Sequence, residues 1–421
     1  MAHFLFYVEP YPIRNTFVHF RSILDNFKES LLRNTTAHTY SIYANGSTLA
    51  ELTKQHAEYA PHFLAPTKDE DALFRSHFVD WYTQGITRWL ELMRESELSE
   101  QYVQLICDLH ARRPFDYIIC WGTNYAVKKA ARKLGIGFIN MELGCSRPPY
   151  LDSLAADPHG VNGGAALAHA SVDDLAAVES TSATDDLWFA DPHHFTGYES
   201  VYAYTNCPPL LERAGKEKMA FIPLQLFDDA NMLRYAPYNT VEEVVLDIAP
   251  KLTEAGYTCI FKEHPASHLR KGSNYANLKA KVTALGYDRV LWLTHLDRCI
   301  PNAKLYQLAD LVITVNSSTG FEALLFDKPL VVLGEAVYKV AGLFPTLDDY
   351  LAGRFDAERY RTLAGKLRHF FLHDYLISKE DANRPDFFFP HLEFVGELSK
   401  QPHLTPKDII EAYIARRRSL R

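Results

Sequence analysis

Residues 311–334 contain the pattern that most restricts what this chain can fold into. A β-branched apolar run from Leu311 is followed by a turn of small residues. A short amphipathic segment then ends at Asp327-Lys328-Pro329, and a second β-branched run follows. This order is typical of a strand, a helix and a second strand in a parallel sheet that is covered on both faces. The stretch therefore predicts an α/β protein.

The turn in the middle of this stretch consists of four consecutive small residues, 317–320. Its backbone N–H groups and hydroxyls would converge at the start of the helix, where the helix dipole favours an anion. Glu322 follows in the first helical turn, where its carboxylate could bind a ribose diol. The alternative is that Ser317, Ser318 and Thr319 only cap the helix, although four small residues exceed what one cap requires.

Length and composition set the number of domains and exclude one class of partner. A chain of 421 residues is too long for one ordinary core, so we expect two domains. The net charge of −8, from 44 basic and 52 acidic residues, argues against a nucleic-acid binder that works by bulk charge. The 6 cysteines include no Cys-x-x-Cys pair, and we expect reduced thiols in a cytoplasmic protein.

Two observations concern membranes. No apolar run approaches the length that spans a bilayer, and residues 1–7 lack the basic segment of a signal peptide. The chain ends in the basic run 415–421, after an amphipathic segment from about Pro406. This tail suits peripheral docking on anionic lipid at the inner membrane, or a solvated helix end where cations are favourable. Both interpretations stay open.

Strand and helix signals recur in two successive halves of the chain. The pattern predicts helices at 16–33 and 69–111, a long loop at 144–170, and a linker at 208–218, where two prolines precede a mixed-charge stretch. The predicted strands lie, in chain order, at 4–8, 117–121, 138–142, 220–224, 257–261, 290–293, 311–315 and 330–333. The sequence thus predicts two α/β halves, each with a mainly parallel sheet.

Polar residues at the carboxyl ends of these strands are the candidates for a functional site, because ligands of parallel sheets bind beyond those ends. The candidates are Glu9, Gly122-Thr123-Asn124, Glu142, Arg147, Gln225, Asp228, Asp229, Lys262, His264 and residues 316–319. Acids in the first half, with a cation, a histidine and an anion nest in the second, suit a phosphorylated or nucleotide-activated donor.

Each candidate also has a purely structural interpretation. His264 precedes a proline, which favours an extended backbone, and it could be a buried hydrogen-bonding residue. Asp228 and Asp229 could form a turn or a helix cap, and Lys262 could be a solvated strand end. Glu142 is harder to dismiss, because an ionised carboxylate in an apolar strand is rarely buried without a partner.

Five short motifs follow one another between residues 142 and 322. They are Glu142-x-Gly144-x-x-Arg147-Pro148, Asp157-Pro158-x-Gly160-Val161-Asn162, Pro223-Leu224-Gln225-x-x-x-Asp229, Lys262-x-His264-Pro265 and Asn316-Ser317-Ser318-Thr319-Gly320-x-Glu322. Together they resemble the capsule polysaccharide synthesis family and, more narrowly, the bacterial retaining β-Kdo transferases of capsule and O-antigen assembly. The resemblance spans about residues 115–335, and five motifs in this order are specific although each alone is weak.

The resemblance implies a GT-B-like fold of two Rossmann-type domains with a cleft between them. The implied domains are an acceptor-side domain at 1–209, a CMP-sugar-binding domain at 218–395, and a helix with the basic tail at 396–421, packing back on the first domain or on a membrane. The implied reaction moves β-Kdo from CMP-β-Kdo to an oligosaccharide or lipid-linked glycan, without a cofactor or metal.

The resemblance also implies roles for single residues. The CMP-sugar donor would be bound by His264, Lys262, Ser317, Ser318, Thr319, Glu322, Arg147 and Gln225. Among these, the histidine and the hydroxyls would hold the phosphate, and Glu322 the ribose. Arg147 and Lys262 would be the cations for the Kdo carboxylate.

Two acids carry the implied catalysis. Retention through two inversions requires a carboxylate nucleophile, for which Asp229 is the candidate and Asp228 the neighbouring alternative. Glu142 would be the acid/base that activates the acceptor hydroxyl. The alternatives are a transferase for another CMP-ulosonic acid, as in sialyltransferases, or for another nucleotide sugar, an epimerase of the same fold, or a non-catalytic glycan- or nucleotide-binding module.

Overall fold

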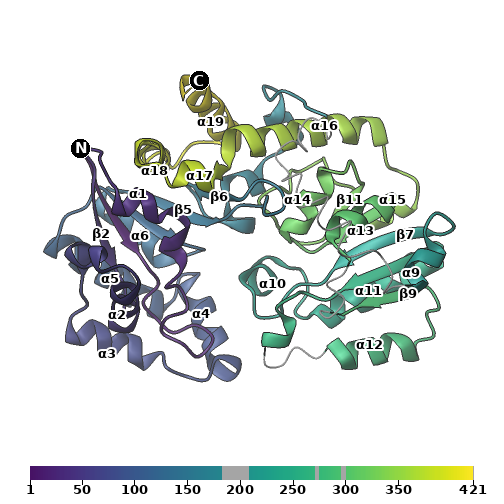
Figure 1. The fold of residues 1–421 in the computed structure, drawn as a ribbon, viewed down its shortest axis with the longest axis horizontal. Coiled ribbons are helices and arrows are strands. Elements are labelled where there is room, and N and C mark those ends of the chain that lie inside the picture. Colours follow the sequence, from purple (N-terminus) through teal and green to yellow (C-terminus); the bar gives the residue numbers. More distant parts are fainter. Residues whose placement is uncertain (183–207, 271–274, 295–299, 421) are drawn as a thin grey trace. The chain divides into compact units, whose positions relative to one another are not determined.

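The computed structural model describes residues 1–182, 208–270, 275–294 and 300–420 (Figure 1). The chain forms two units, each built around its own sheet. Unit 1 comprises Met1–Gly144, Ser153–Ala166 and Leu376–Thr405, and unit 2 comprises Cys145–Asp152, Leu167–Tyr375 and Pro406–Arg421. The chain therefore passes repeatedly from one unit to the other, and neither unit is one continuous segment.

Unit 1 is built on a seven-stranded sheet with the order β12-β6-β5-β4-β1-β2-β3. Its strands are β1 (His3–Tyr7), β2 (Thr39–Tyr43), β3 (Phe63–Leu64), β4 (Tyr117–Trp121), β5 (Gly137–Leu143), β6 (Ser153–Asp157) and β12 (Ile377–Ser378). Its helices are η1 (Ile23–Phe27), α1 (Lys28–Leu32), α2 (Gly46–Gln55), η2 (Ala57–His62), α3 (Lys68–Ser76), η3 (Trp81–Gly85), α4 (Ile86–Leu92), α5 (Glu97–Arg112), α6 (Tyr125–Leu134), η4 (Asn162–Gly164), α17 (Lys379–Ala382) and α18 (Pro385–Ser399).

The strand order of unit 1 reverses between β1 and β4. The chain leaves β1 toward β2 and β3 on one side and returns to β4 on the other, and all of these neighbours pair in parallel. β5 continues the parallel sheet, whereas β6 and β12 add antiparallel strands at its far edge. This reversal is the topological switch point at which such sheets bind ligands.

The helix α18, drawn in yellow in Figure 1, returns late in the sequence to cover unit 1 and contacts β5. Two glycines allow this approach: a Cβ on Gly137 would lie 2.7 Å from the carbonyl oxygen of Gly396. Phe138 N donates to Ser399 Oγ at 2.8 Å. The ring of Phe389 packs against Phe4, with centroids 5.5 Å apart.

Unit 2 is built on a five-stranded sheet with the order β11-β10-β7-β8-β9, in which every pair is parallel. Its strands are β7 (Lys218–Pro223), β8 (Tyr257–Lys262), β9 (Val290–Leu293), β10 (Leu311–Thr314) and β11 (Leu330–Val332). Its helices are η5 (Ala166–His169), η6 (Val172–Leu175), α9 (Pro208–Arg213), α10 (Ala230–Tyr235), α11 (Val241–Glu254), η8 (Ser267–Leu269), α12 (Tyr275–Ala284), α13 (Asn302–Leu308), α14 (Ser318–Leu324), α15 (Leu347–Leu351), α16 (Ala357–His369), η9 (Phe370–Tyr375) and α19 (Pro406–Leu420).

The sheet of unit 2 reverses between β7 and β10, since the chain leaves β7 toward β8 and β9 and returns beside β7 with β10. Its core is a continuous apolar cluster in which strand residues such as Phe261 and Ile313 pack with Val245 and Ile248 of α11. α11 begins where a helix signal is found in the sequence: Thr240 accepts a hydrogen bond from Glu243 N in its N-terminal cap.

The structure confirms the predicted α/β class, with two Rossmann-like units that are each built on a mainly parallel sheet. The helix predicted at 69–111 is interrupted twice. α3 ends at Ser76 and η3 begins after its N-cap Asp80, η3 continues directly into α4, and α4 ends at Leu92 before Ser96 caps α5. The loop predicted at 144–170 contains β6, a short strand that pairs back on β5. The predicted linker contains α9, and the boundaries assigned to the domains stay predictions.

Two further findings concern single residue types. Gly135 ends α6 in the left-handed conformation with φ of 69°, which glycine commonly adopts after a helix. The described cysteines, 107, 120, 145 and 259, are free thiols, whereas Cys207 and Cys299 lie outside the described residues.

Candidate active site

Two amide side chains join the strands that flank the switch point of unit 2. Gln225, just after β7, donates from Nε2 to Asn316 Oδ1 at 2.8 Å, and Asn316 N donates to Gln225 Oε1 at 3.1 Å. Asn316 Nδ2 also donates to the carbonyl oxygen of Asn231 at 2.9 Å. Gln225 therefore fixes the loops that surround the carboxyl edge, and its predicted contact with a donor stays a prediction.

The turn after β10 is held from both sides. Ser317 is the N-cap of α14, and its Oγ accepts from Thr319 N at 3.3 Å. The hydroxyl of Tyr338 donates to the carbonyl oxygen of Ser317. A Cβ on Gly320 would lie 2.4 Å from that hydroxyl, which explains why glycine stands in this turn. Capping is thus real for Ser317, whereas Ser318, half-buried, makes no side-chain hydrogen bond to the described residues.

Glu322 lies on α14 in a buried polar network. It is 8% exposed, and Oε2 accepts from the hydroxyl of Tyr306 at 2.8 Å. Burial raises the pKa of Glu322 to about 7. The Tyr306 hydrogen bond and the positive charge of Arg147 oppose this rise, as do Lys262 and Asn302 to a smaller extent. The carboxyl group can therefore change its charge near neutral pH.

Lys262 ends β8 and is oriented by the segment that precedes and begins α13. Its Nζ donates to the carbonyl oxygen of Ile300 and to Asn302 Oδ1, both at 2.8 Å. The ammonium group is only partly exposed, and its charge acts on Glu322. The interpretation as a freely solvated strand end is therefore wrong.

His264 follows two residues later, and its ring is oriented by the backbone. Ala266 N donates to Nδ1 at 3.0 Å, which assigns the proton of the neutral ring to Nε2. Burial lowers the pKa of His264 below its usual 6.5; the negative charge of Asp229 opposes this, and nearby arginines add to it. A neutral ring can offer a directed Nε2–H donor to an anionic group.

The two neighbouring aspartates differ in their surroundings. Asp228 is completely buried, with Oδ1 lying 3.5 Å from Nε of Arg270. Asp229 is half-buried and begins α10, where its Oδ1 accepts from Asn231 N at 2.9 Å. Because the charge of Asp229 acts on the ring of His264, this carboxylate belongs to the same neighbourhood as the histidine.

Arg147 belongs to unit 2 through the short segment Cys145–Asp152. This segment is attached by Tyr150, whose ring packs on Phe326 with centroids 6.1 Å apart. The charge of Arg147 acts on both Glu322 and His264. The structure therefore brings Arg147, Glu322, Lys262, His264 and Asp229 together at one edge of one sheet.

Glu142 lies in unit 1, near the end of β5, opposite Ala155 of β6. It is half-buried, and its Oε1 accepts from Leu143 N at 2.8 Å. The roles predicted for Glu142 and for the aspartates stay predictions.

The switch point of unit 1 carries a buried carboxylate. Glu9, just after β1, is 3% exposed, and Asn124 Nδ2 lies 3.0 Å from each of its carboxylate oxygens. Asn124 is oriented by its own Oδ1, which caps α6 by accepting from Val127 N. Burial raises the pKa of Glu9 to about 7, although the hydrogen bonds from Asn124 and Tyr11 oppose this rise.

In the motif that begins at Asp157, the side chain binds backbone N–H groups of unit 1. The Asp157 carboxylate is completely buried and accepts hydrogen bonds from the N–H groups of His159, Gly160 and Ala166 at 2.7 to 3.2 Å. A Cβ on Gly160 would lie 2.5 Å from the carbonyl oxygen of Gly164. The motif thus fixes the loop after β6.

Sequence reasoning missed the residues that orient the site from neighbouring helices and loops. Tyr306, Asn302 and Tyr338 hold Glu322, Lys262 and the Ser317 turn, respectively. Tyr306 is completely buried on α13, which the sequence predicts only as a short helix at 301–309. A large aromatic residue on the inner face of such a helix was the available signal.

The described parts of the chain contain no group of three or more His, Cys, Asp or Glu side chains that could hold a metal ion. In the same residues, no helix is both long and apolar enough to cross a bilayer.

Residues 208–376 match the family model for capsule polysaccharide biosynthesis proteins. The matched segment carries the last three motifs, which supports the broader part of the predicted resemblance. The capsule polysaccharide export protein KpsS of Escherichia coli is 25% identical over 285 residues, which cover 56% of this chain and 71% of the relative.

Two solved structures are similar at a lower level. The β-Kdo 2,7 transferase KpsC of Thermosulfurimonas dismutans is 19% identical, with 75% of this chain and 97% of that chain covered and a TM-score of 0.35. A glycosyltransferase from Rickettsia africae is 11% identical, with coverage of 96% and 100% and a TM-score of 0.40.

Proposed function

We propose that this protein is a glycosyltransferase of surface polysaccharide assembly that transfers β-Kdo from CMP-β-Kdo to a saccharide acceptor with retention. The observation that carries the proposal is the grouping of two cations, a neutral histidine, a buried glutamate and an aspartate at the carboxyl edge of one parallel sheet. The family match over residues 208–376 supports this proposal, because it covers all of these residues except Arg147.

The nucleotide part of the donor needs hydrogen-bond donors for its phosphate and acceptors for its ribose. In the proposal, His264 Nε2–H and the hydroxyl of Ser318 bind the phosphate, and Glu322 accepts from the ribose diol. Tyr306 keeps Glu322 in position through the 2.8 Å hydrogen bond. Charge-assisted bonds of this kind are stronger than neutral ones, so a phosphate can be held without a metal.

The sugar part of the donor carries a carboxylate, which needs a cation. Arg147 and Lys262 are the two cations whose charges act on Glu322, and Lys262 is held in place by Asn302. We assign the Kdo carboxylate to this pair. Arginine is suited to the contact because its planar guanidinium can bind a carboxylate with two parallel hydrogen bonds.

Retention follows from two displacements at the anomeric carbon. Asp229 forms a bond to that carbon while the bond to the phosphate oxygen breaks, and CMP leaves with the electron pair. Since Asp229 Oδ1 is held by Asn231 N, the attack is assigned to Oδ2. An acceptor hydroxyl then displaces the aspartate, and Glu142 takes its proton, which completes the transfer and restores the free carboxylate.

The test is incubation of the full-length protein with CMP-β-Kdo and a panel of saccharide acceptors. We expect release of CMP, a product with a β-Kdo linkage by NMR, and the same activity in EDTA. If the protein used CMP-sialic acid and not CMP-β-Kdo, the donor sugar in the proposal would be a different ulosonic acid. Absence of CMP release with any donor would support a non-catalytic module and overturn the proposal.

A further inference from the structure

A small cavity lies in unit 1 beside the residues that follow β1. Its volume is about 10 Å³, and its walls include Tyr11, Asn15, His77, Trp81, Arg88 and Trp89. Such a volume holds one water-sized group. The walls range from Trp81, which is 1% exposed, to Asn15, which is exposed. A ligand lying over the cavity could therefore insert one oxygen atom into it.

The backbone on two sides of this cavity has unusual conformations. Arg14 and Asn15 are consecutive non-glycine residues with φ of 52° and 61°. Opposite them, η3 is a single π-helical turn, and the two segments are joined because Trp81 N donates to Asn15 Oδ1 at 2.7 Å. Strained residues and π-helical turns are concentrated at functional sites.

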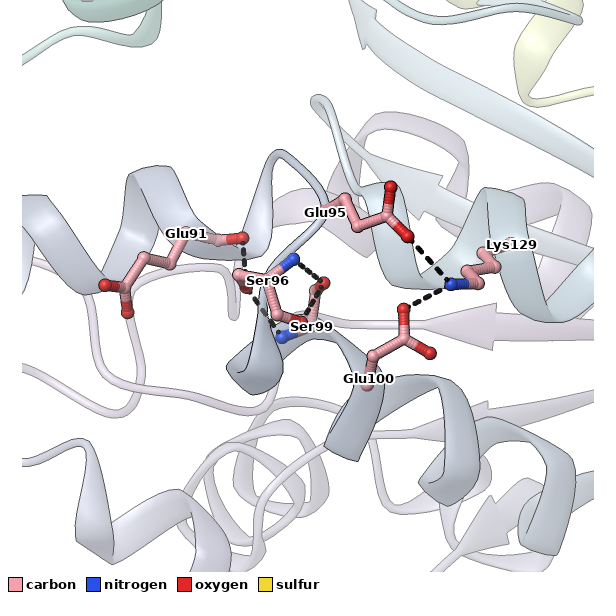
Figure 2. Close-up of polar contacts among 6 residues, drawn as sticks. All are labelled: Glu91, Glu95, Ser96, Ser99, Glu100 and Lys129. Atoms are coloured by element: carbon pink, nitrogen blue, oxygen red, sulfur yellow. Dashed lines mark hydrogen bonds and ion pairs between the residues drawn. The ribbon is translucent and has the colours of Figure 1, made fainter.

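The helix α4, which carries Arg88 and Trp89, is fixed to α5 (Figure 2). Ser96 and Ser99 form a reciprocal capping box at the start of α5, and Ser96 Oγ donates to the carbonyl oxygen of Glu91 at 2.9 Å. Figure 2 also shows Lys129 of α6 between Glu95 and Glu100, with Glu95 at 3.3 Å. These contacts hold the cavity wall in position without a ligand.

Two hydrogen-bond donors around the cavity, Trp81 Nε1 and the Arg88 guanidinium, have no partner among the described residues. Nε1 of Trp81 is buried and makes no hydrogen bond to any residue that the structure describes, although almost all buried polar groups in proteins do. Arg88 is half-buried and forms no ion pair with any residue that the structure describes. Trp89 is also partly exposed, and its ring lies against that of Trp81, with centroids 5.4 Å apart.

We propose that this cavity is the anchor point of a binding site for an acidic saccharide, in which one carboxylate oxygen accepts from Trp81 Nε1–H and Arg88 while the sugar ring lies on Trp89. Unpartnered donors select an acceptor group, and the cation selects a negatively charged one. The partly exposed aromatic face provides apolar contact for the C–H face of a sugar ring. The identification of the bound saccharide as the acceptor chain rests on the proposed function. The binding of an acidic saccharide to this cavity does not.

The experiment measures binding of methyl glycosides to the full-length protein by saturation-transfer NMR. The probes are the methyl β-glycosides of glucuronic acid, N-acetylneuraminic acid and Kdo, each paired with its carboxyl-reduced counterpart, and glucose 1-phosphate as a phosphate source. We expect at least one acidic glycoside to bind, and its reduced counterpart to bind about tenfold more weakly or worse, as expected for the loss of a charged hydrogen bond. Preferential binding of the phosphate would overturn the assignment to a carboxylate.

Three variants test the walls of the site. Arg88→Gln, Trp81→Phe and Trp89→Leu should each weaken binding of the acidic glycoside by about fivefold or more. Trp81→Phe removes the N–H group together with the five-membered ring of a buried side chain, so it should also lower the melting temperature. Arg88→Gln, at a half-buried position, tests binding without creating such a cavity. Arg75→Gln and Phe78→Leu, at exposed positions outside the cavity wall, are the matched controls and should bind normally.

The outcomes separate this inference from the proposed function. If no acidic glycoside binds, or if binding is unchanged in both Arg88→Gln and Trp81→Phe, the cavity holds only water and the inference is wrong. Release of CMP from CMP-β-Kdo by the same preparation would show that the proposed function survives that result. Glycoside binding without any CMP release would leave the site standing and overturn the proposed function alone.

Discussion

The two units place different side chains at the same topological position, the switch point of a parallel sheet. At the switch point of unit 1, Asn124 donates to the buried carboxylate of Glu9, whereas in unit 2 two neutral amides, Gln225 and Asn316, bind each other. In both units an asparagine follows the strand that returns to the centre of the sheet. The difference lies in charge: unit 1 keeps a titratable acid at this point, and unit 2 keeps the point neutral.

The surrounding charges follow the same division. The neutral pair of unit 2 is accompanied by Lys262 and Arg147, which leaves the carboxyl edge suited to an anionic ligand. Unit 1 places Glu142 near the end of β5 and Glu9 at the end of β1. A nucleotide donor suits the edge of unit 2, and a ligand whose hydroxyl must lose a proton suits unit 1.

The largest effect is expected from variants that distinguish the roles of the two aspartates of unit 2. Asp229→Asn should lower kcat by about 10³-fold or more, the size seen when a catalytic group is removed, with a nearly unchanged melting temperature because asparagine also caps helices. Asp228→Asn should instead lower stability by about 1–3 kcal/mol and retain activity, since Asp228 is the buried partner of Arg270. Steady-state kinetics and thermal melting check both, and the reverse pattern would move the nucleophile to Asp228.

The next largest effect concerns the two buried glutamates, one in each unit, whose pKa values are both raised from 4.5 to about 7. Between these values the unfolded chain releases the proton and the folded one retains it, so stability falls as pH rises through the window from 4.5 to 7. Each glutamate accounts for up to about 3 kcal/mol of this loss. Glu9→Gln and Glu322→Gln should therefore each flatten the dependence of melting temperature on pH.

The same pair of variants also distinguishes the units by function. Glu322→Gln should raise the KM for CMP-β-Kdo, because an amide replaces the carboxylate that we assign to the ribose, and Glu9→Gln should not. The exposed Glu58→Gln is the control for a change of charge alone. Equal effects of the two buried variants on donor KM would contradict the assignment of the donor to unit 2.

The smallest effect is expected from a single methyl group. Gly320→Ala would place a Cβ 2.4 Å from the Tyr338 hydroxyl and 2.7 Å from Thr314 Cγ2, which should destabilise unit 2 by about 1–3 kcal/mol and weaken donor binding. Gly46→Ala is the control in unit 1, because nothing lies within 4 Å of the added Cβ. Thermal melting of both variants decides whether the turn after β10 needs this close approach.

The sequence predicts the strand-end residues of unit 2 well, because a parallel sheet brings the carboxyl ends of its strands to one edge. Lys262, His264 and Glu322 lie together for that reason. Their partners were not predictable, since nothing in a short helix indicates that Tyr306 faces a glutamate 16 residues later. Such contacts depend on long-range packing, which local sequence patterns do not indicate.

The organisation of unit 1 was less predictable for a related reason. β6 is short and pairs with the strand just before it, and β12 has only two residues, so neither gives a clear alternation of polar and apolar residues. The cavity beside Trp81 also escaped prediction, because an aromatic stripe at helical spacing is usually part of a core. In this case the indole nitrogen of Trp81 has no hydrogen-bond partner within the described ranges of the chain.

The interleaving of the two units has a practical consequence for anyone who dissects the protein. A fragment trimmed to residues 208–376 would keep the five-stranded sheet of unit 2 but lose Arg147, and with it the guanidinium whose charge acts on Glu322. It would also lose α19, whose Tyr413 packs on Tyr375 with ring centroids 5.2 Å apart. Neither half of this molecule can be excised with a single cut.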